Sequence, residues 1–139
     1  MKGVENHMSI QISGLAHIGV FVKDLKRSLA FYTEKLGFTC TFQYMNEGVT
    51  PVAFIQNGSC VIELVEKPET EGRGDGIVDH IAFAVENIEK TVECLRAAGI
   101  ETEEKNITYC PECFAEGAKW ILFRGPDGEH LEITERGPF

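Results

Sequence analysis

The sequence lacks the excess of basic residues that partners of nucleic acids and anionic membranes carry. Its 139 residues include 13 Lys and Arg against 22 Asp and Glu, which gives a formal net charge of -9 at pH 7. Binding to phosphate backbones or anionic surfaces depends on a positive surface that displaces counterions. We therefore expect no nucleic acid and no membrane among its partners.

Long apolar runs are also missing. No run approaches the roughly 18 residues of a membrane-spanning helix, and the start, MKGVENHMSIQIS, has neither the apolar region nor the cleavage site of a signal peptide. We expect a cytoplasmic protein. With 43% hydrophobic residues, the chain can form one compact domain or two small halves that share a core.

The cysteines do not suit a disulfide framework. There are five of them, an odd number, and they are scattered along the chain. This usage favours reduced thiols. Cys110 and Cys113 have C-x-x-C spacing, but the motif occurs only once. A structural or incidental role is one interpretation of this pair, and redox control of a lid over the cleft is the alternative.

What the sequence does contain is an internal repeat. The segments that align with each other are residues 16–38 with 79–100, and residues 61–67 with 130–136. The alignment superimposes His17 on His80 and Glu63 on Glu132. Self-similarity of this kind means that one structural unit, of about 50 residues, occurs twice.

Each unit reads as a strand, a helix and three further strands. Asp24 and Asn87 are suited to N-cap the helices, and Gly37 and Gly99 stand where a left-handed C-terminal residue is wanted. We expect strands at residues 15–22, 39–45, 51–56 and 60–66, then 78–85, 101–106, 118–124 and 129–135.

These elements predict an α+β fold of two tandem βαβββ modules. The expected boundaries are an N-terminal tail (1–13), a first module (14–66), a linker (67–77) and a second module (78–136).

Strand alternation places one imidazole and one carboxylate of each module on the same face. Aliphatic positions such as Ile18 and Ile62 mark the face that the helix covers. His17 and Glu63 then lie on the opposite face, as do His80 and Glu132. If the two sheets come together by pseudo-twofold symmetry, these four side chains converge in a cleft.

Two imidazoles and two carboxylates in one cleft favour a metal site, because buried carboxylates are costly unless they are paired or bind a cation. The mixed nitrogen and oxygen set suits nickel, zinc, cobalt or manganese, and four protein ligands leave open positions for water or substrate. The alternative is that the histidines are core residues and the glutamates lie on a solvated sheet face.

The sequence resembles the vicinal oxygen chelate superfamily, which includes glyoxalase I, bleomycin-resistance proteins and extradiol dioxygenases. The likeness covers residues 14–136 and rests on HIGVFVKDLKRSLAFYTEKLGF, DHIAFAV and GPDGEHLEITE. It implies paired βαβββ modules that form a cupped mixed sheet around one divalent metal ion, most often nickel or zinc. The metal ligands implied are His17, Glu63, His80 and Glu132.

The four-ligand set resembles that of glyoxalase I or methylmalonyl-CoA epimerase. Bacterial glyoxalase I, a lactoylglutathione lyase, is the nearer match, which implies conversion of a hemithioacetal of a 2-oxoaldehyde such as methylglyoxal. Glu132 would be the principal base and Glu63 its counterpart. An epimerase acting on an acyl thioester, or a protein that sequesters a small molecule without turning it over, is the alternative.

One position departs from the resemblance. Bacterial glyoxalase I commonly has an arginine for the glutathione carboxylate where this sequence has Phe21. The thiol of the substrate is therefore open. The resemblance also implies a homodimer, with the site either within one chain or across two.

Overall fold

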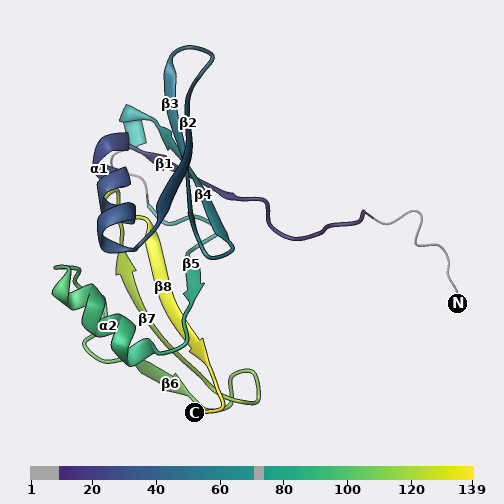
Figure 1. The fold of residues 1–139 in the computed structure, drawn as a ribbon. Coiled ribbons are helices and arrows are strands. Elements are labelled where there is room, and N and C mark those ends of the chain that lie inside the picture. The colour runs from purple at the N-terminus through teal and green to yellow at the C-terminus, as the bar shows by residue number, and fades with distance from the viewer. Residues whose placement is uncertain (1–9, 71–73) are drawn as a thin grey trace, which may run out of the picture.

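Two four-stranded mixed sheets, each with a helix against one face, make up the protein (Figure 1). The structure, a computed structural model, describes residues 10–70 and 74–139, so most of the expected N-terminal tail (1–9) lies outside the described residues. The strand orders are β1-β4-β3-β2 and β5-β8-β7-β6. In each sheet the first two strands are parallel and the others antiparallel. The predicted α+β fold of two βαβββ units is confirmed.

The elements of the first sheet and its helices are β1 (Ile18–Val22), α1 (Leu25–Ala30), the π-helix η2 (Phe31–Lys35), β2 (Thr39–Asn46), β3 (Thr50–Asn57) and β4 (Cys60–Glu66). A 3-10 helix, η3 (Pro68–Thr70), follows. The second set is β5 (Ile81–Ala84), α2 (Ile88–Ala97), β6 (Thr108–Cys110), β7 (Ala118–Arg124) and β8 (His130–Arg136). None of the described helices is long and apolar enough to span a membrane.

The prediction of a strand at residues 101–106 is wrong. Only Thr102 forms a bridge there, to Phe123, and the strand β6 begins at Thr108. The Glu104 carboxylate accepts a hydrogen bond from the backbone N–H of Leu122 at 3.0 Å. A side chain thus satisfies an amide of β7 that a neighbouring strand would otherwise pair. The predicted strands at 15–22 and 78–85 were too long, since β1 and β5 start just after His17 and His80.

Both helices begin in the same way. The side chains of Asp24 and Asn87 accept from backbone amides three residues on, at 3.2 and 3.0 Å. The first amide of each helix donates to a carboxylate at the end of the sheet, to Glu66 at 2.9 Å and to Glu135 at 2.8 Å. Glu66 and Glu135 are aligned by the repeat, so the structure repeats the capping as well as the chain path.

The core is shared by the two modules. Its fully buried members come from both, among them Val22, Tyr32, Ile55, Ile62, Leu64, Ile88, Ile121, Phe123 and Leu131. Phe38 of the first module and Phe83 of the second lie edge to face with ring centroids 5.9 Å apart. Burial of this apolar surface is the main stabilising contribution to the fold.

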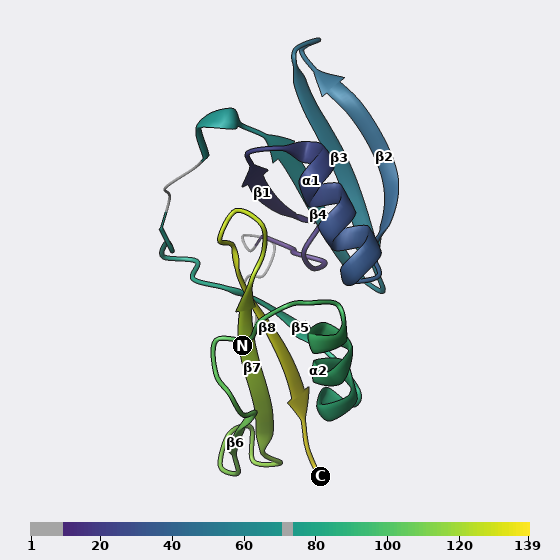
Figure 2. The same ribbon diagram turned by 90° about the vertical axis from the view of Figure 1, so that its left-hand side faces the viewer.

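Polar contacts add to the junction of the modules. The turn between β7 and β8 reaches the first module (Figure 2). There Asp127 accepts from the Arg27 guanidinium at 2.6 Å and from the Lys23 amide at 3.2 Å. The buried Tyr32 hydroxyl donates to Glu129 at 2.8 Å. The turn of one module therefore stabilises the first helix of the other.

Candidate metal site

The predicted residues of each module form a pair. His17 Nε2 lies 3.4 Å from Glu63 Oε1, and His80 Nε2 lies 3.2 Å from Glu132 Oε1. All four side chains are partly or largely shielded from solvent, Glu132 most of all, with 14% of its side chain exposed.

Parallel strand pairing explains both contacts. Glu63 on β4 is in register with Gly19 on β1, and Glu132 on β8 is in register with Ala82 on β5. Each histidine is two residues before that small residue and shares its face. A Cβ atom at Gly19 would lie 3.7 Å from the Glu63 carboxylate, so small residues at these positions leave room for the carboxylates.

The two pairs do not join into one cluster within the single chain. Among the residues that the structure describes, the group of three candidate ligands whose atoms lie within 4.8 Å of one another is Asp79, His80 and His130. Convergence of all four predicted ligands stays a prediction.

The geometry of each pair fits two ligands of one divalent metal ion. Bonds of about 2.1 Å at right angles to each other place adjacent ligand atoms roughly 3 Å apart. The observed separations of 3.4 and 3.2 Å are close to this value. An imidazole nitrogen beside a carboxylate is also the donor set that suits nickel, zinc, cobalt or manganese.

Glu132 of the second pair lines a cavity of about 740 Å³. The walls also include Ala82, Ala84, Phe114 and Trp120. Burial raises the pKa of the Glu132 carboxyl above its ordinary value, although the nearby His80 opposes this shift. A carboxylate with a raised pKa is a stronger base than an exposed one, so the cavity combines room for a small molecule with a group that can take a proton.

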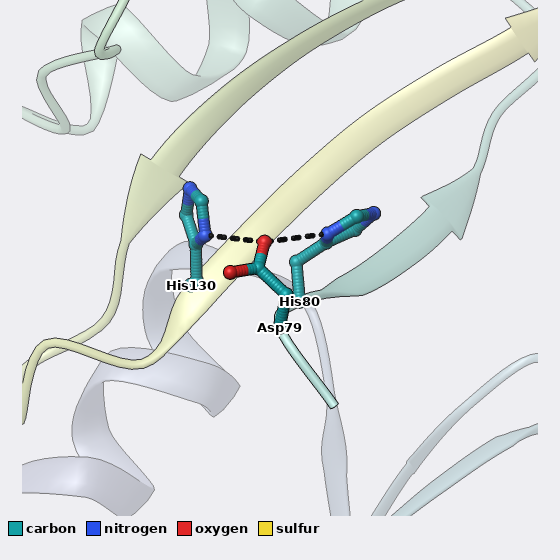
Figure 3. Close-up of side chains that lie close together, drawn as sticks. All are labelled: Asp79, His80 and His130. Atoms are coloured by element: carbon teal, nitrogen blue, oxygen red, sulfur yellow. Dashed lines mark hydrogen bonds and ion pairs between the residues drawn. The ribbon is translucent and has the colours of Figure 1, made fainter. Parts of the chain in front are cut away.

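Sequence reasoning missed the role of Asp79. Its Oδ2 atom accepts a hydrogen bond from His80 Nδ1 at 3.0 Å and lies 3.2 Å from His130 Nδ1 (Figure 3). The hydrogen bond from His80 holds the pKa of Asp79 below its ordinary value, and the charge of His130 adds to this effect. The only signal in the sequence was the position of an acidic residue directly before the predicted ligand.

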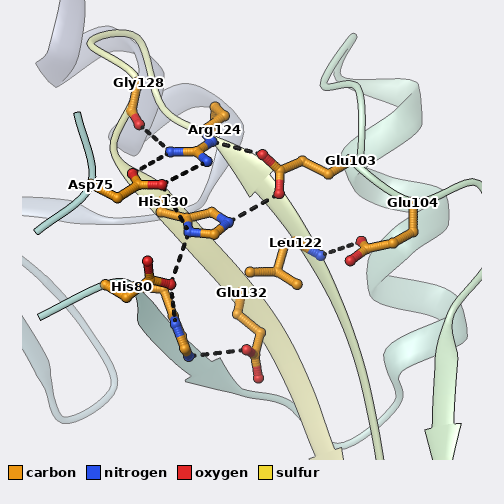
Figure 4. A network of polar contacts seen from close by, with 10 residues as sticks. Asp75, His80, Glu103, Glu104, Leu122, Arg124, Gly128, His130 and Glu132 are labelled. Atoms are coloured by element: carbon orange, nitrogen blue, oxygen red, sulfur yellow. Dashed lines mark hydrogen bonds and ion pairs between the residues drawn. The ribbon is translucent and has the colours of Figure 1, made fainter. Parts of the chain in front are cut away.

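His130 connects this cluster to a wider network of polar side chains (Figure 4). Its Nε2 atom lies 3.0 Å from Glu103, and Glu103 accepts from Arg124 at 2.7 Å. Arg124 also forms two hydrogen bonds to Asp75, of 2.6 and 3.0 Å. His130 lies two residues before Glu132 on β8 and therefore shares its face. Its contacts are those of a residue that supports the cluster.

Arg73, Lys119 and Arg124 are basic side chains that could contact an anionic substrate. Lys119 pairs with Glu89 at 2.9 Å, and Arg124 is taken up by the network just described. Arg73, the third candidate, lies outside the described residues. Phe21 is 45% exposed, and the Lys67 ammonium lies 5.6 Å from the centre of its ring. An ammonium group therefore lies near the position where an arginine was expected.

All five cysteines are free thiols, as predicted. Cys113 lines the cavity beside Glu132. Cys110 donates to the Glu112 carboxylate at 3.3 Å, and this contact raises the pKa of the thiol. Because the thiolate is the reactive form, this environment disfavours redox chemistry at Cys110.

The fold and the paired histidines and glutamates define a recognisable class. The family described as the glyoxalase/bleomycin resistance protein/dioxygenase superfamily matches residues 14–133. The chain belongs to this superfamily, as the sequence resemblance predicted.

Relatives of known sequence divide into two kinds. The chain is 34% identical to the uncharacterized protein YwkD of Bacillus subtilis, over 90% of this chain and 98% of that protein. It is 32% identical to a probable chloroplastic lactoylglutathione lyase of Arabidopsis thaliana, over 89% of this chain but only 36% of that protein. The chain thus spans about a third of the plant protein.

Solved structures share the fold. A glyoxalase family protein from Enterococcus faecalis is 26% identical with a TM-score of 0.73, over 88% of this chain and 98% of that one. FosX, a fosfomycin resistance protein from Listeria monocytogenes complexed with Mn(II) and sulfate, is 21% identical with a TM-score of 0.69, over 91% of this chain and 95% of that one. The second likeness concerns the fold alone.

Proposed function

We propose that this chain is a divalent-metal-dependent lyase of the glyoxalase I type, which converts the hemithioacetal of a 2-oxoaldehyde into a 2-hydroxyacyl thioester. The observation that carries the proposal is the matched pair of imidazole and carboxylate in each module, at 3.4 and 3.2 Å. The distant likeness to a probable lactoylglutathione lyase supports it. Five free thiols support a reducing compartment, the cytoplasm.

The four predicted ligands, His17, Glu63, His80 and Glu132, would hold one nickel, zinc, cobalt or manganese ion. When bound, such an ion polarises the substrate oxygens and increases the acidity of the adjacent C–H bond. FosX, one of the proteins that share this fold, was solved with Mn(II).

Glu132 is the proposed base. Its carboxylate takes the proton from the carbon that bears the sulfur and returns it to the neighbouring carbonyl carbon, so that no atom is gained or lost. Burial raises the pKa of Glu132 and brings it nearer to the operating pH, which favours both halves of the transfer. The apolar walls of the adjoining cavity, among them Phe114 and Trp120, give the substrate a surface to pack against. Glu63 is the counterpart in the first module.

The complete site requires a second copy of the chain in this proposal. Each copy has two half-sites, and a twofold axis can place the first pair of one copy against the second pair of the other. Large, strongly exposed apolar side chains support an interface. The side chains that are at least 80% exposed are Ile10, Ile12, Leu15, Ile77 and Val78.

The experiment measures metal content and then turnover of methylglyoxal hemithioacetals, with glutathione and other thiols, by purified protein. Glu132→Gln should lower kcat by about 10²- to 10⁴-fold, the usual contribution of a positioned base. Glu135→Gln is the matched control, because Glu135 borders the same cavity and its amide oxygen can still cap α2.

Two results would contradict the proposal. A metal-bound wild-type protein that turns over no hemithioacetal would exclude the lyase; epimerisation of an acyl-CoA by that protein would identify the alternative enzyme, and tight ligand binding without turnover would identify a sequestering protein. Equal loss of activity in Glu132→Gln and Glu135→Gln would remove Glu132 from its role.

A further inference from the structure

The carboxylate of Asp79 lies between the two imidazoles of the second module (Figure 3). One oxygen, Oδ2, is 3.0 Å from His80 Nδ1 and 3.2 Å from His130 Nδ1. No residue at the corresponding place in the first module can do this, because Ala16 precedes His17. The two modules therefore have matching predicted metal ligands, but only the second has a carboxylate directly before its histidine.

The contact with Asp79 sets which nitrogen of His80 carries the proton. An ionised carboxylate can only accept hydrogen bonds, so Nδ1 of His80 must donate. The lone pair of a neutral imidazole then lies on Nε2, because this atom is 3.2 Å from Glu132 but forms no hydrogen bond with it, whereas Nδ1 does form one with Asp79. Only this lone pair can bind a metal ion in the predicted site, and a carboxylate partner on the other nitrogen is the usual device that fixes a ligating histidine.

His130 lies on the other side of Asp79, with its Nδ1 atom 3.2 Å from Asp79 Oδ2. Its side chain is 13% exposed, and its Nδ1 atom is buried without a hydrogen bond of regular geometry among the described residues. Its other nitrogen lies 3.0 Å from Glu103 (Figure 4). Because Glu103 is fixed by Arg124 at 2.7 Å, the His130 ring has little freedom to turn away from Asp79.

Among residues 10–70 and 74–139, no carboxylate braces the His17 ring in the way that Asp79 braces His80. The His17 ring packs edge to face against Phe54, with ring centroids 5.4 Å apart. A phenyl ring does not distinguish the two tautomers of an imidazole in the way that a carboxylate does.

We propose that Asp79 is a positioning residue, supported by His130, which presets His80 so that the second module is the preorganised half of the metal site. This inference rests on the proposed function, since the preset nitrogen is useful only to a bound metal ion. The second module, which contains Asp79, contributes more to the metal affinity than the first module, which completes the coordination.

The test follows the tautomer of His80 by ¹⁵N NMR in the metal-free protein at pH 8, and metal affinity by calorimetry with Zn²⁺ or Ni²⁺. The wild-type protein should show His80 protonated on Nδ1. Asp79→Ala should give a mixture of tautomers and a 10- to 100-fold weaker affinity. Asp79→Asn, whose amide oxygen still accepts, should retain much of the wild-type tautomer. Glu93→Ala on the exposed surface of α2 is the control and should change neither.

Three outcomes would overturn the inference. The first is an unchanged His80 tautomer in a folded Asp79→Ala protein. The second is an Asp79→Asn protein that retains the His80 tautomer but loses as much metal affinity as Asp79→Ala. The third is a metal content that drops from two ions per chain to one in Asp79→Ala and in His130→Ala, which would make both residues ligands of a second ion.

Failure of the proposed function would look different. The metal-bound wild-type protein would then turn over no hemithioacetal, whereas the NMR signals of the metal-free protein would still report whether Asp79 sets the tautomer. The tautomer measurement needs neither metal nor substrate.

Discussion

At the scale of single residues, Tyr32 links the two modules through one hydroxyl group. The side chain is fully buried, and its hydroxyl donates to the Glu129 carboxylate at 2.8 Å. Burial, together with the charge of Glu129, raises the pKa of Tyr32 well above its ordinary value. The group therefore stays protonated and remains a donor throughout the physiological pH range.

Tyr32→Phe should lower the free energy of unfolding by about 1.5–3 kcal/mol, the usual worth of a hydrogen bond to a charged group. The aromatic packing against Phe31 and Phe38 remains in this variant. Urea unfolding measures the change. Tyr109→Phe, at an exposed position, is the control and should have little effect. An unchanged stability in Tyr32→Phe would mean that water replaces the lost donor without cost.

The sequence predicted the residues of the two pairs but not the support of the second. Alternation along β4 and β8 is a local rule, and it sufficed to place Glu63 and Glu132 on the faces of His17 and His80. The role of Asp79 depends on the direction of its side chain before the start of β5. No periodic pattern encodes that direction.

At the scale of elements, α2 begins with two acceptors. Asn87 Oδ1 accepts from a backbone amide at 3.0 Å, and Glu135 accepts from the first helical amide at 2.8 Å. Asn87→Ala should lower the free energy of unfolding by about 1 kcal/mol, because an amide of the first turn loses its partner.

Asn87→Asp is the matched variant for this prediction. Its carboxylate can accept the same hydrogen bond and is favoured at a helix N-terminus, so the stability should remain close to that of the wild type. Thermal unfolding of both variants gives the comparison. If Asn87→Asp lost as much stability as Asn87→Ala, the cap would not be the cause.

Arg124 joins three segments that are distant in the sequence: β7, the acidic segment after α2 and the linker. Its hydrogen bonds lower the pKa values of Asp75 and Glu103. Carboxyls with lowered pKa values contribute stability above their ordinary pKa, and this contribution is lost as the pH falls through the lowered values.

Arg124→Gln should therefore melt a few degrees below the wild-type protein at pH 7, and the difference should shrink as the pH falls from about 4 towards 2. It should also shrink in concentrated salt, because these side chains are partly exposed. Calorimetry over this pH range is the measurement. A difference that stays constant with pH would assign the loss to packing.

The limits of prediction at this scale are clearest at the edge of the second sheet. The bounds of strand β4, Cys60–Glu66, were predicted correctly. Its side chains alternate between the two faces of the sheet, and a tight turn precedes it. Strand β6, at the edge of the second sheet, was predicted too early in the chain. The Glu104 side chain, and not a strand at residues 101–106, accepts the hydrogen bond from an amide of β7. Propensity and periodicity do not report that kind of competition.

At the scale of the whole molecule, the separation of the two pairs within one chain leads to a mixing experiment. His17→Ala and His80→Ala should each be inactive alone. A mixed dimer contains one chain of each variant. If each site takes its two pairs from different chains, one site of the mixed dimer has two mutated pairs. The other site combines the wild-type His17 of one chain with the wild-type His80 of its partner and is intact.

Mixing the two variants after mild unfolding and refolding should thus restore about a quarter of the wild-type activity, because half of the dimers are mixed and each has one intact site. His17→Ala mixed with itself is the control. No restoration, with mixed dimers detected by mass spectrometry, would place each site within one chain.

The Asp127 carboxylate belongs to the second module but contacts the start of α1 in the first. Each module therefore depends on the other for part of its stability. A lone first half would lose this carboxylate and the Glu129 acceptor of Tyr32, and a lone second half would expose Phe83. Either half expressed alone is therefore expected to be less stable than the same residues within the full chain.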